Sequence, residues 1–235
     1  MSELVRIDPA APGAENMRTD ESLLDRCVRG ELLRVVRLYA FRPACLSLGR
    51  MQSDCDVDVD ACRRDGVDVV RRPSGGRAVL HDRDVTYAVV CRTDDPDLGG
   101  AVLASCARIH AVVAAGLASM GVATIAHAQT SGAPGRIEET AEVGDCFSRP
   151  SAHELLDAQR RKLVGSAQAR RAGALLQHGS VLLEPHRAAA YIRTPQAQRR
   201  SASVGQILRR DVTFDEVAVA LRHAFERVLG PRALV

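Results

Sequence analysis

A cysteine and a lysine are the residues in this sequence that first suggest covalent chemistry. Of the 32 basic residues 31 are arginine, and Lys162 is the single lysine. A compact ammonium cannot be replaced by a planar guanidinium, so a lone lysine is expected where an amine is chemically required, although chance explains it equally well. Cys146 lies sixteen residues earlier. A thiolate attacks thioesters well, and a nearby ammonium would lower the thiol pKa and polarise the substrate carbonyl.

A second candidate site lies in residues 71–87, where the sequence predicts a strand, a turn and a strand. Val67–Arg72 alternates as a strand does, Pro73 removes a ladder N–H, and Gly75 and Gly76 permit positive φ. A bare glycine backbone lets a carbonyl or phosphate approach closely, and neighbouring arginines could hold an anion. The alternative without a binding function is a glycine hairpin with solvated charges. The polar residues of this turn are Arg71, Arg72, Ser74, Arg77, His81 and Asp82.

Several stretches together resemble the lipoate–protein ligase and octanoyltransferase family, which shares a fold with the biotin protein ligases. Arg71–Asp82 is similar to the family signature Arg-Arg-x-Ser/Thr-Gly-Gly-x-Ala-Val-x-His-Asp. Cys146–Leu155 resembles the run Cys-Phe-x-x-Pro-Ser-x-x-Glu-Leu of the octanoyltransferase branch, where ligases typically carry Asn-Asp in place of Cys-Phe. Arg161–Gln168 and Gln177–Ser180 match two family strands, and Asn16–Leu24 matches a scaffolding stretch. His153 stands where an aromatic residue is more usual.

The resemblance implies an α/β (α+β) fold, a mixed β-sheet packed with helices, of the biotin/lipoate protein ligase type that is similar to class II aminoacyl-tRNA synthetases. It also implies a reaction in which an octanoyl group leaves the phosphopantetheine thiol of acyl carrier protein and rests on Cys146 as a thioester. The group then passes to a lysine of a lipoyl domain, such as the glycine-cleavage H protein. Lys162 would activate the thiol, and neither a cofactor nor a metal would be needed.

The same resemblance supplies the residues expected to line the acyl and substrate site. They are Arg50, Arg72, Ser74, Gly75, Gly76, Arg77, His81, Gly165, Ser166, Ala167, His178 and Gly179. Arg50 belongs to a Gly-Arg-x-Gln corner that lies near the acyl pocket in the family. Gly165 lies in a predicted strand, where a missing side chain allows a ligand to pass closely.

Two other functions remain open at this point. In an ATP-dependent lipoate–protein ligase, which would use ATP and Mg, Lys162 would bind a lipoyl-adenylate and Cys146 would be incidental. Such ligases usually have three glycines where this chain has Gly75-Gly76-Arg77, and Arg77 would crowd an adenylate. A non-catalytic module that binds acyl carrier protein is the third possibility, against which the presence of both Cys146 and Lys162 speaks.

The elements that must position these residues follow from periodicity and capping signals. We expect helices at Asn16–Arg29, with Thr19 or Asp20 as N-cap, at Asp58–Asp65, at Leu98–Met120, and after the capping box that begins at Thr213. His110 lies beside the apolar stripe of the third helix and is expected to be structural. The further predicted strands are Leu33–Phe41, Ala44–Leu48, Ala78–Leu80, Val85–Val90, Val122–Ala126, Arg161–Gln168 and Ala174–Leu183. Residues 129–145 lack periodicity and are expected to form a loop, with a lid over an acyl channel favoured.

Composition limits the partners and the location. We expect one catalytic domain over 1–235, with 1–18 poorly ordered or at an edge and 193–235 as a C-terminal helical segment. Seven cysteines without CxxC spacing argue against a disulfide framework and a zinc site. A net charge of +3 is too weak to indicate nucleic acid, and no apolar run is read as a membrane span. We therefore expect a cytoplasmic monomer whose basic stretch Arg193–Arg210 steers the acidic acyl carrier protein.

Overall fold

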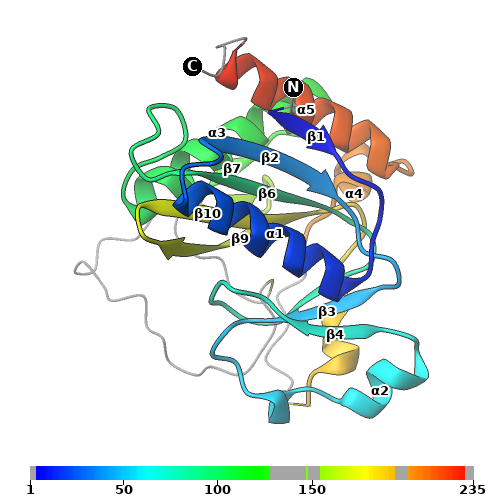
Figure 1. The fold of residues 1–235 in the computed structure, drawn as a ribbon. Helices are drawn as coiled ribbons and strands as arrows, with labels where there is room; N and C mark the ends of the chain where they lie inside the picture. Colours follow the sequence, from blue (N-terminus) through cyan, green and yellow to red (C-terminus); the bar gives the residue numbers. More distant parts are fainter. Residues whose placement is uncertain (1–3, 128–146, 148–153, 194–200, 231–235) are drawn as a thin grey trace, which may run out of the picture.

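The computed structural model describes residues 4–127, 147, 154–193 and 201–230. In these residues a seven-stranded sheet has the order β1-β2-β6-β10-β9-β8-β7, and a smaller sheet has the order β4-β3-β5 (Figure 1). The strands of the larger sheet are β1 (Val5–Ile7), β2 (Arg34–Tyr39), β6 (Asp84–Arg92), β7 (Ile125–Ala126), β8 (Leu155–Leu156), β9 (Lys162–Arg171) and β10 (Ala174–Leu182). Those of the smaller sheet are β3 (Cys45–Leu48), β4 (Asp68–Arg71) and β5 (Val79–His81). This confirms the expected mixed sheet.

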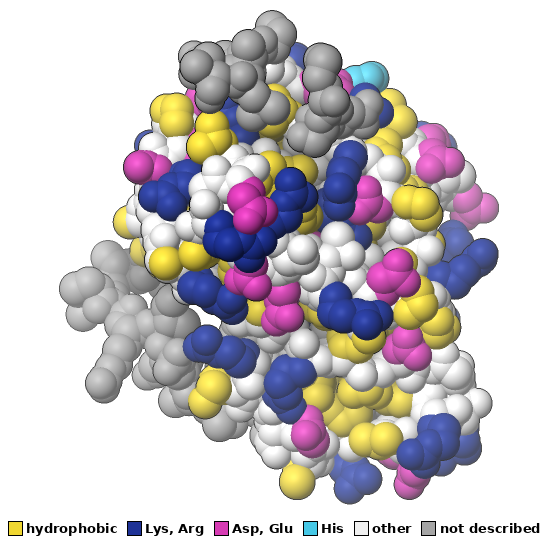
Figure 2. Space-filling view, viewed as in Figure 1, with side chains coloured by type: hydrophobic (Ala, Val, Ile, Leu, Met, Phe, Trp, Pro, Cys, Tyr) yellow, Lys and Arg dark blue, Asp and Glu magenta, His cyan; other side chains and the backbone are white. Residues whose placement is uncertain are grey.

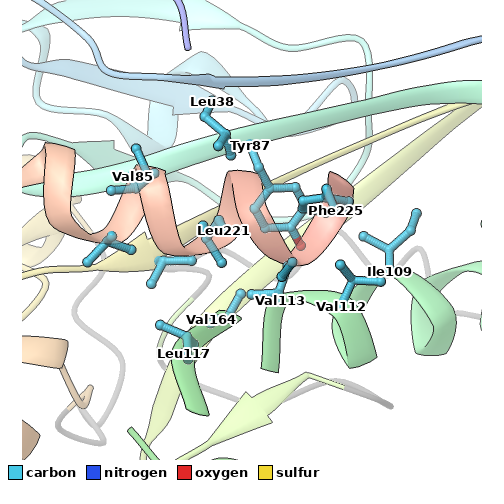
Figure 3. Packing of buried hydrophobic residues seen from close by; sticks show 14 of the residues in the cluster. Leu38, Val85, Tyr87, Ile109, Val112, Val113, Leu117, Val164, Leu221 and Phe225 are labelled. Atoms are coloured by element: carbon cyan, nitrogen blue, oxygen red, sulfur yellow. The ribbon is translucent and has the colours of Figure 1, made fainter. Parts of the chain in front are cut away.

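Helices cover both faces of the larger sheet. The helices are α1 (Gly13–Val28), α2 (Val59–Arg64), α3 (Val102–Ser119), α4 (Val204–Leu208) and α5 (Phe214–Leu229), with 3₁₀ turns η1 (Asp54–Asp56) and η3 (Ala188–Tyr191). In Figure 1, α1 crosses one face of the sheet, and α3 and α5 lie on the other. The main core is formed between α3, α5 and the sheet, where Val113, Leu117, Leu221 and Phe225 pack on Tyr87 (Figure 3).

The two strands matched by the family resemblance lie side by side at the centre of the larger sheet. β10 pairs antiparallel with both β6 and β9, so that Gly179 lies opposite Tyr87 on one side and Ser166 on the other. Because opposite residues of a sheet share a face, His178 and Ala167 project to the α1 side together. Gly165, Ala167, His178 and Ser180 are therefore brought to the α1 side, whereas Ser166 faces α3, where its hydroxyl lies 3.0 Å from Nε2 of His110.

The glycine turn differs from the hairpin that was one interpretation of the sequence. β4 and β5, which precede and follow the turn, do not pair with each other, because β3 lies between them. β3 runs parallel to β4 and antiparallel to β5. Residues 72–78 therefore form a connection that passes over the end of β3, and the bare hairpin interpretation is wrong.

The first helix begins earlier than its capping residues suggested. α1 starts at Gly13 after Pro12, and neither Thr19 nor Asp20 caps it. Asp20 is instead completely buried in the middle of the helix, where it accepts hydrogen bonds from Arg37 and Tyr39. A buried ion pair thus accounts for an acidic residue that resembled a helix start in the sequence. The segment before the helix forms the edge strand β1, parallel to β2.

Two other expectations for helices are refined. Thr213 does form a capping box with Glu216 at the start of α5, as predicted. The segment 193–235, expected to be helical, contains α4 and α5, while Arg199 and Arg200 lie outside the described residues. α3 is long and apolar enough to cross a membrane by length and composition alone, contrary to our interpretation of the sequence. In the structure its Ile109, Val113 and Leu117 are buried in the main core.

Candidate active site

A small cavity of about 30 Å³, partly open to solvent, lies between α1, the centre of the larger sheet and the smaller sheet. It is lined by Met17, Tyr39, Phe41, Ser47, Arg72, Val79, His81, Thr86, Gly165, Ser166, Ala167, His178, Gly179 and Ser180. Seven of these were expected as site residues, from both family motifs. Of the lining residues only Ser166 and Ala167 are partly exposed, which places the opening beside them.

The two ends of this cavity belong to different apolar clusters. Met17, Tyr39 and Phe41 form one wall, and they pack within a cluster that α1 shares with β2 and β10. Val79 forms another wall and packs with Phe147 and Leu182. Phe147 follows Cys146 directly in the chain. The cavity therefore has one wall against α1 and another at Val79, which packs in the same cluster as the residue after the candidate nucleophile.

Lys162 lies at the Phe147 end and is buried. Its Nζ is 2.7 Å from Oε1 of Glu154 and 5.2 Å from the centre of the Phe147 ring. Only 2% of the Lys162 side chain and 3% of the Glu154 side chain are exposed, so both charges have been taken out of water. A buried ammonium is tolerated when a carboxylate pairs with it, and this pair is held by β9 and by the start of β8. Lys162 itself is not among the residues that line the cavity.

His81 presents its ring to the cavity and ties its nitrogens to protein groups. Nδ1 lies 2.9 Å from Oδ2 of the buried Asp84, and Nε2 lies 2.9 Å from Oγ of Ser47. Phe41 stacks on the ring at 4.2 Å between centroids. Burial opposes ionisation of Asp84, but the charge of His81 and hydrogen bonds from His81, Ser180 and Thr86 hold the pKa of Asp84 below its ordinary value. The polar edge of this imidazole is thus satisfied without a ligand.

His178 repeats the arrangement on the neighbouring strand. Its Nδ1 is 3.4 Å from Oδ2 of Asp20, and its Nε2 is hydrogen-bonded to the hydroxyl of Ser74. Burial lowers the pKa of His178 in spite of Asp20, so the ring is neutral at neutral pH. The ring nitrogens of both histidines are thus bonded within the protein, and the lining also includes the apolar side chains of Met17, Phe41 and Val79. This lining suits an apolar ligand.

Arg72 holds the glycine turn against the smaller sheet. Its guanidinium donates hydrogen bonds to the carbonyls of Ser47 at 2.8 Å, Gly75 at 2.8 Å and Arg77 at 2.6 Å. Gly76 has a φ of +88°, which L side chains rarely adopt, and a Cβ placed there would lie 3.9 Å from the Cβ of Ala167. The turn therefore stands at the rim of the cavity opening.

Some expected site residues lie outside the cavity. Arg50 is exposed and does not line the cavity; its backbone N–H donates to the Ser74 carbonyl at 2.9 Å and its carbonyl accepts from Arg71 at 3.3 Å, so its place in the acyl wall stays a prediction. Gly75, Gly76 and Arg77 form the rim and do not line the cavity. Ser74 does not line the cavity, but its hydroxyl is hydrogen-bonded to Nε2 of His178, which does. Cys146, His153 and residues 129–145 lie outside the described residues.

Sequence reasoning missed the residues that close the cavity and support its histidines. Met17 and Asp20 belong to the helical motif interpreted as scaffold, Thr86 lies in a strand interpreted as buried, and Ser180 lies in a family motif but was not among the expected site residues. The sequence did contain a signal for Thr86 and Ser180, because a hydroxyl in a buried strand needs a hydrogen-bond partner. Here both hydroxyls donate to Asp84, Thr86 at 3.0 Å and Ser180 at 2.5 Å. His110, expected to be structural, lies 3.0 Å from the hydroxyls of Tyr87 and Ser166.

Most of the described cysteines are poor candidates for a nucleophile. Burial is the leading cause that raises the pKa of Cys27, Cys45, Cys62, Cys91 and Cys106, in the last case to about 11. These thiols are protonated at neutral pH, whereas the thiolate is the reactive form. Cys55 is exposed in η1 and does not line the cavity. In the described part of the chain no group of three or more His, Cys, Asp or Glu side chains could hold a metal ion.

Comparisons with known proteins agree with the geometry. A relative from Kyrpidia tusciae, named Octanoyltransferase LipM, is 41% identical over 213 residues, which cover 89% of this chain and 74% of the relative. A relative of the same name from Symbiobacterium thermophilum is 36% identical over 235 residues, which cover 93% of this chain and 83% of that one. Both matches extend over most of this chain.

A solved structure gives the same fold. The bipartite lipoate protein ligase of Thermoplasma acidophilum superposes with a TM-score of 0.68 at 23% identity, over 97% of this chain and 84% of the other. The family model described as Lipoyl protein ligase A/B catalytic domain matches residues 12–226. This span includes the glycine turn, Lys162 and the residues that line the cavity. With both motif strands at that cavity and nearly the whole chain matched, this protein belongs to the lipoyl protein ligase A/B catalytic-domain family.

Proposed function

We propose that this protein is an octanoyltransferase that moves an octanoyl group from acyl carrier protein, through a thioester on Cys146, to a lysine of a lipoyl domain such as the glycine-cleavage H protein. The observation that carries the proposal is the cavity with an apolar wall at Met17 and a second wall that reaches Lys162 through Phe147. Relatives that match most of this chain share the name Octanoyltransferase LipM, which supports octanoyl transfer.

The proposed reaction has two steps, and each balances without a cofactor. In the first, the Cys146 thiolate attacks the carbonyl of the donor thioester, the bond to the phosphopantetheine sulfur breaks, and that sulfur leaves as a thiolate that takes up a proton. In the second, a neutral ε-amine attacks the acyl-cysteine, an amide forms, the Cys146 thiolate is released, and the amine gives up a proton. Lys162, kept charged by Glu154, would lower the thiol pKa and stabilise the developing oxyanion.

The distribution of reactive thiols favours Cys146. The raised pKa values of five other cysteines keep those thiols protonated at neutral pH, and Cys55 does not line the cavity. Cys146 is followed by Phe147, which contacts the wall residue Val79 in a buried cluster. The chain therefore passes close to the cavity one residue after Cys146.

An ATP-dependent ligase is the second candidate, because Thermoplasma lipoate protein ligase has the same fold. A ligase would have to bind its nucleotide at the glycine turn. Arg72 belongs to the signature that both branches of the family share, so its hydrogen bonds to the carbonyls of Gly75 and Arg77 do not separate them. The relatives named Octanoyltransferase LipM, which match most of this chain, make the ligase function the less favoured of the two.

The decisive experiment is intact mass spectrometry after incubation with octanoyl acyl carrier protein in the absence of ATP. We expect the wild-type mass to rise by one octanoyl group, and the group to move to a purified lipoyl domain when that acceptor is added. Cys146→Ala should give neither adduct nor transfer. The matched control is Cys55→Ala, which removes an exposed thiol in η1 and should retain both.

Two outcomes would overturn the proposal. Full transfer by Cys146→Ala would remove the acyl-enzyme from the mechanism. No adduct without ATP, followed by lipoylation with ATP and free lipoate, would select the ligase.

The place where acyl carrier protein binds is a separate part of the proposal. The stretch 193–210 is expected to steer this acidic partner, but Arg210 is engaged with Glu216 and with the Asp211 carbonyl. On the face that carries α1, basic and acidic side chains alternate over the surface (Figure 2). Steering of this partner by the arginines of 193–210 remains the proposal, and Arg209 in that stretch is exposed.

A further inference from the structure

Met17 is the one long, flexible and apolar side chain among the described residues that line the cavity. It lies on the buried face of α1 with 7% of its surface exposed. Methionine fills irregular space and its removal leaves no polar group unsatisfied. Its position at the cavity wall therefore affects the shape of the cavity without affecting the hydrogen-bond networks around it.

The other two residues of the same wall are fixed by polar or stacking contacts. The Tyr39 hydroxyl donates to Asp20 at 2.8 Å, and Phe41 stacks on the ring of His81. A change at either would disturb the carboxylate–histidine pairs that line the cavity. Met17 is thus the position at which this wall can move while the rest of the site remains in place.

The wall at Met17 and the charge at Lys162 belong to different ends of the site. Met17 packs in the cluster beneath α1, whereas Lys162 contacts Phe147, which packs with Val79 and Leu182. Between the two ends, β9 passes Gly165, whose missing side chain leaves room along the strand.

We propose that Met17 closes the far end of the acyl cavity and sets the length of the acyl chain that the enzyme accepts. This inference rests on the proposed function, because it takes the carbonyl of the substrate to lie at the Lys162 end. The terminal methyl group of an octanoyl chain would then meet the Met17 side chain. A longer chain would have to displace Met17, and a shorter chain would leave an empty space in front of it.

The test compares acyl carrier proteins loaded with hexanoyl, octanoyl and decanoyl groups. We expect Met17→Ala to raise the ratio of kcat/KM for decanoyl to that for octanoyl by on the order of tenfold, since one or two methylenes in an apolar pocket discriminate by such factors. Met17→Val removes fewer atoms and should give a smaller shift in the same direction. Met17→Leu conserves volume and should leave the ratio near its wild-type value.

The control is Leu24→Ala, which opens the same apolar cluster beneath α1 without lining the cavity. It should lower the melting temperature and leave the chain-length ratio unchanged. An unchanged ratio in both Met17→Ala and Met17→Val, with octanoyl transfer retained, would overturn the inference while the proposed function stands. Absence of octanoyl transfer in the wild-type protein would instead remove the proposed function itself.

Discussion

At the scale of single residues, the pairing of Lys162 with Glu154 combines catalysis and stability in one contact. Both side chains are almost fully buried and 2.7 Å apart. Removing one member of such a buried pair typically costs about 3–5 kcal/mol of unfolding free energy. The same charge is the one expected to lower the pKa of the Cys146 thiol.

We therefore expect Glu154→Gln to lower the unfolding free energy by about 3–5 kcal/mol in urea denaturation. The double variant Glu154→Gln with Lys162→Met should recover much of that loss, because the uncompensated charge is gone. It should nevertheless remain inactive in octanoyl transfer. A double variant that is as unstable as Glu154→Gln, or that transfers the acyl group, would contradict this account.

At the scale of elements, two glycines of the turn region differ in the space available for a side chain. A Cβ on Gly49 would lie 1.8 Å from the carbonyl oxygen of Gly76, whereas a Cβ on Gly75 would meet nothing within 4 Å. Gly49 is thus needed for the close contact between its loop and the glycine turn. Gly75 is free to change as far as the fold is concerned, so an effect of its replacement reports on a ligand.

We expect Gly49→Ala to displace the turn and to lower the unfolding free energy by about 1–3 kcal/mol, as overpacking does. Gly75→Ala is the matched control and should melt at the wild-type temperature. If Gly75→Ala keeps its stability but loses octanoyl transfer, the substrate approaches the backbone at that glycine. Equal melting temperatures for both variants would contradict the close contact at Gly49.

The sequence predicted the elements better than their partners. β9 and β10 and the residues Gly165, His178 and Gly179 were expected because a signature run marks a strand and its ligand-facing positions together. Asp20 was misjudged because an acidic residue near a helix start resembles a cap, and burial against Arg37 depends on β2, which is distant in sequence. We predicted no role for Glu154 or Met17 from the sequence, because their contacts are with residues that belong to other elements of the fold.

At the scale of the whole molecule, buried titrating groups make the stability depend on pH. The pKa of His178 is lowered from 6.5 by burial, so the unfolded chain binds this proton more tightly than the folded chain does. The contribution of His178 is therefore complete above pH 6.5 and is lost as the pH falls toward its lowered pKa. Asp84, whose pKa is lowered from 3.8, adds a second loss below that value.

We expect the melting temperature, followed by calorimetry from pH 8 to pH 3.5, to begin its decline near pH 6.5. His178→Gln should remove part of the slope between pH 6.5 and pH 5, whatever its effect on the melting temperature itself. His223→Gln on the exposed face of α5 is the control and should leave the slope unchanged. An identical slope in all three proteins would show that His178 does not titrate as described.

The central pairing of β6 with β10 has a consequence for the synthesis of this chain on the ribosome. β6 is apolar and completely buried along most of its length, but its partner β10 is made much later, after α3 and residues 128–153. α5, which covers the same face, is made later still. Pairing over such sequence separations is slow, and it leaves apolar strands exposed in the meantime. The nascent chain therefore exposes the apolar surface of β6 until β10 and α5 have been made.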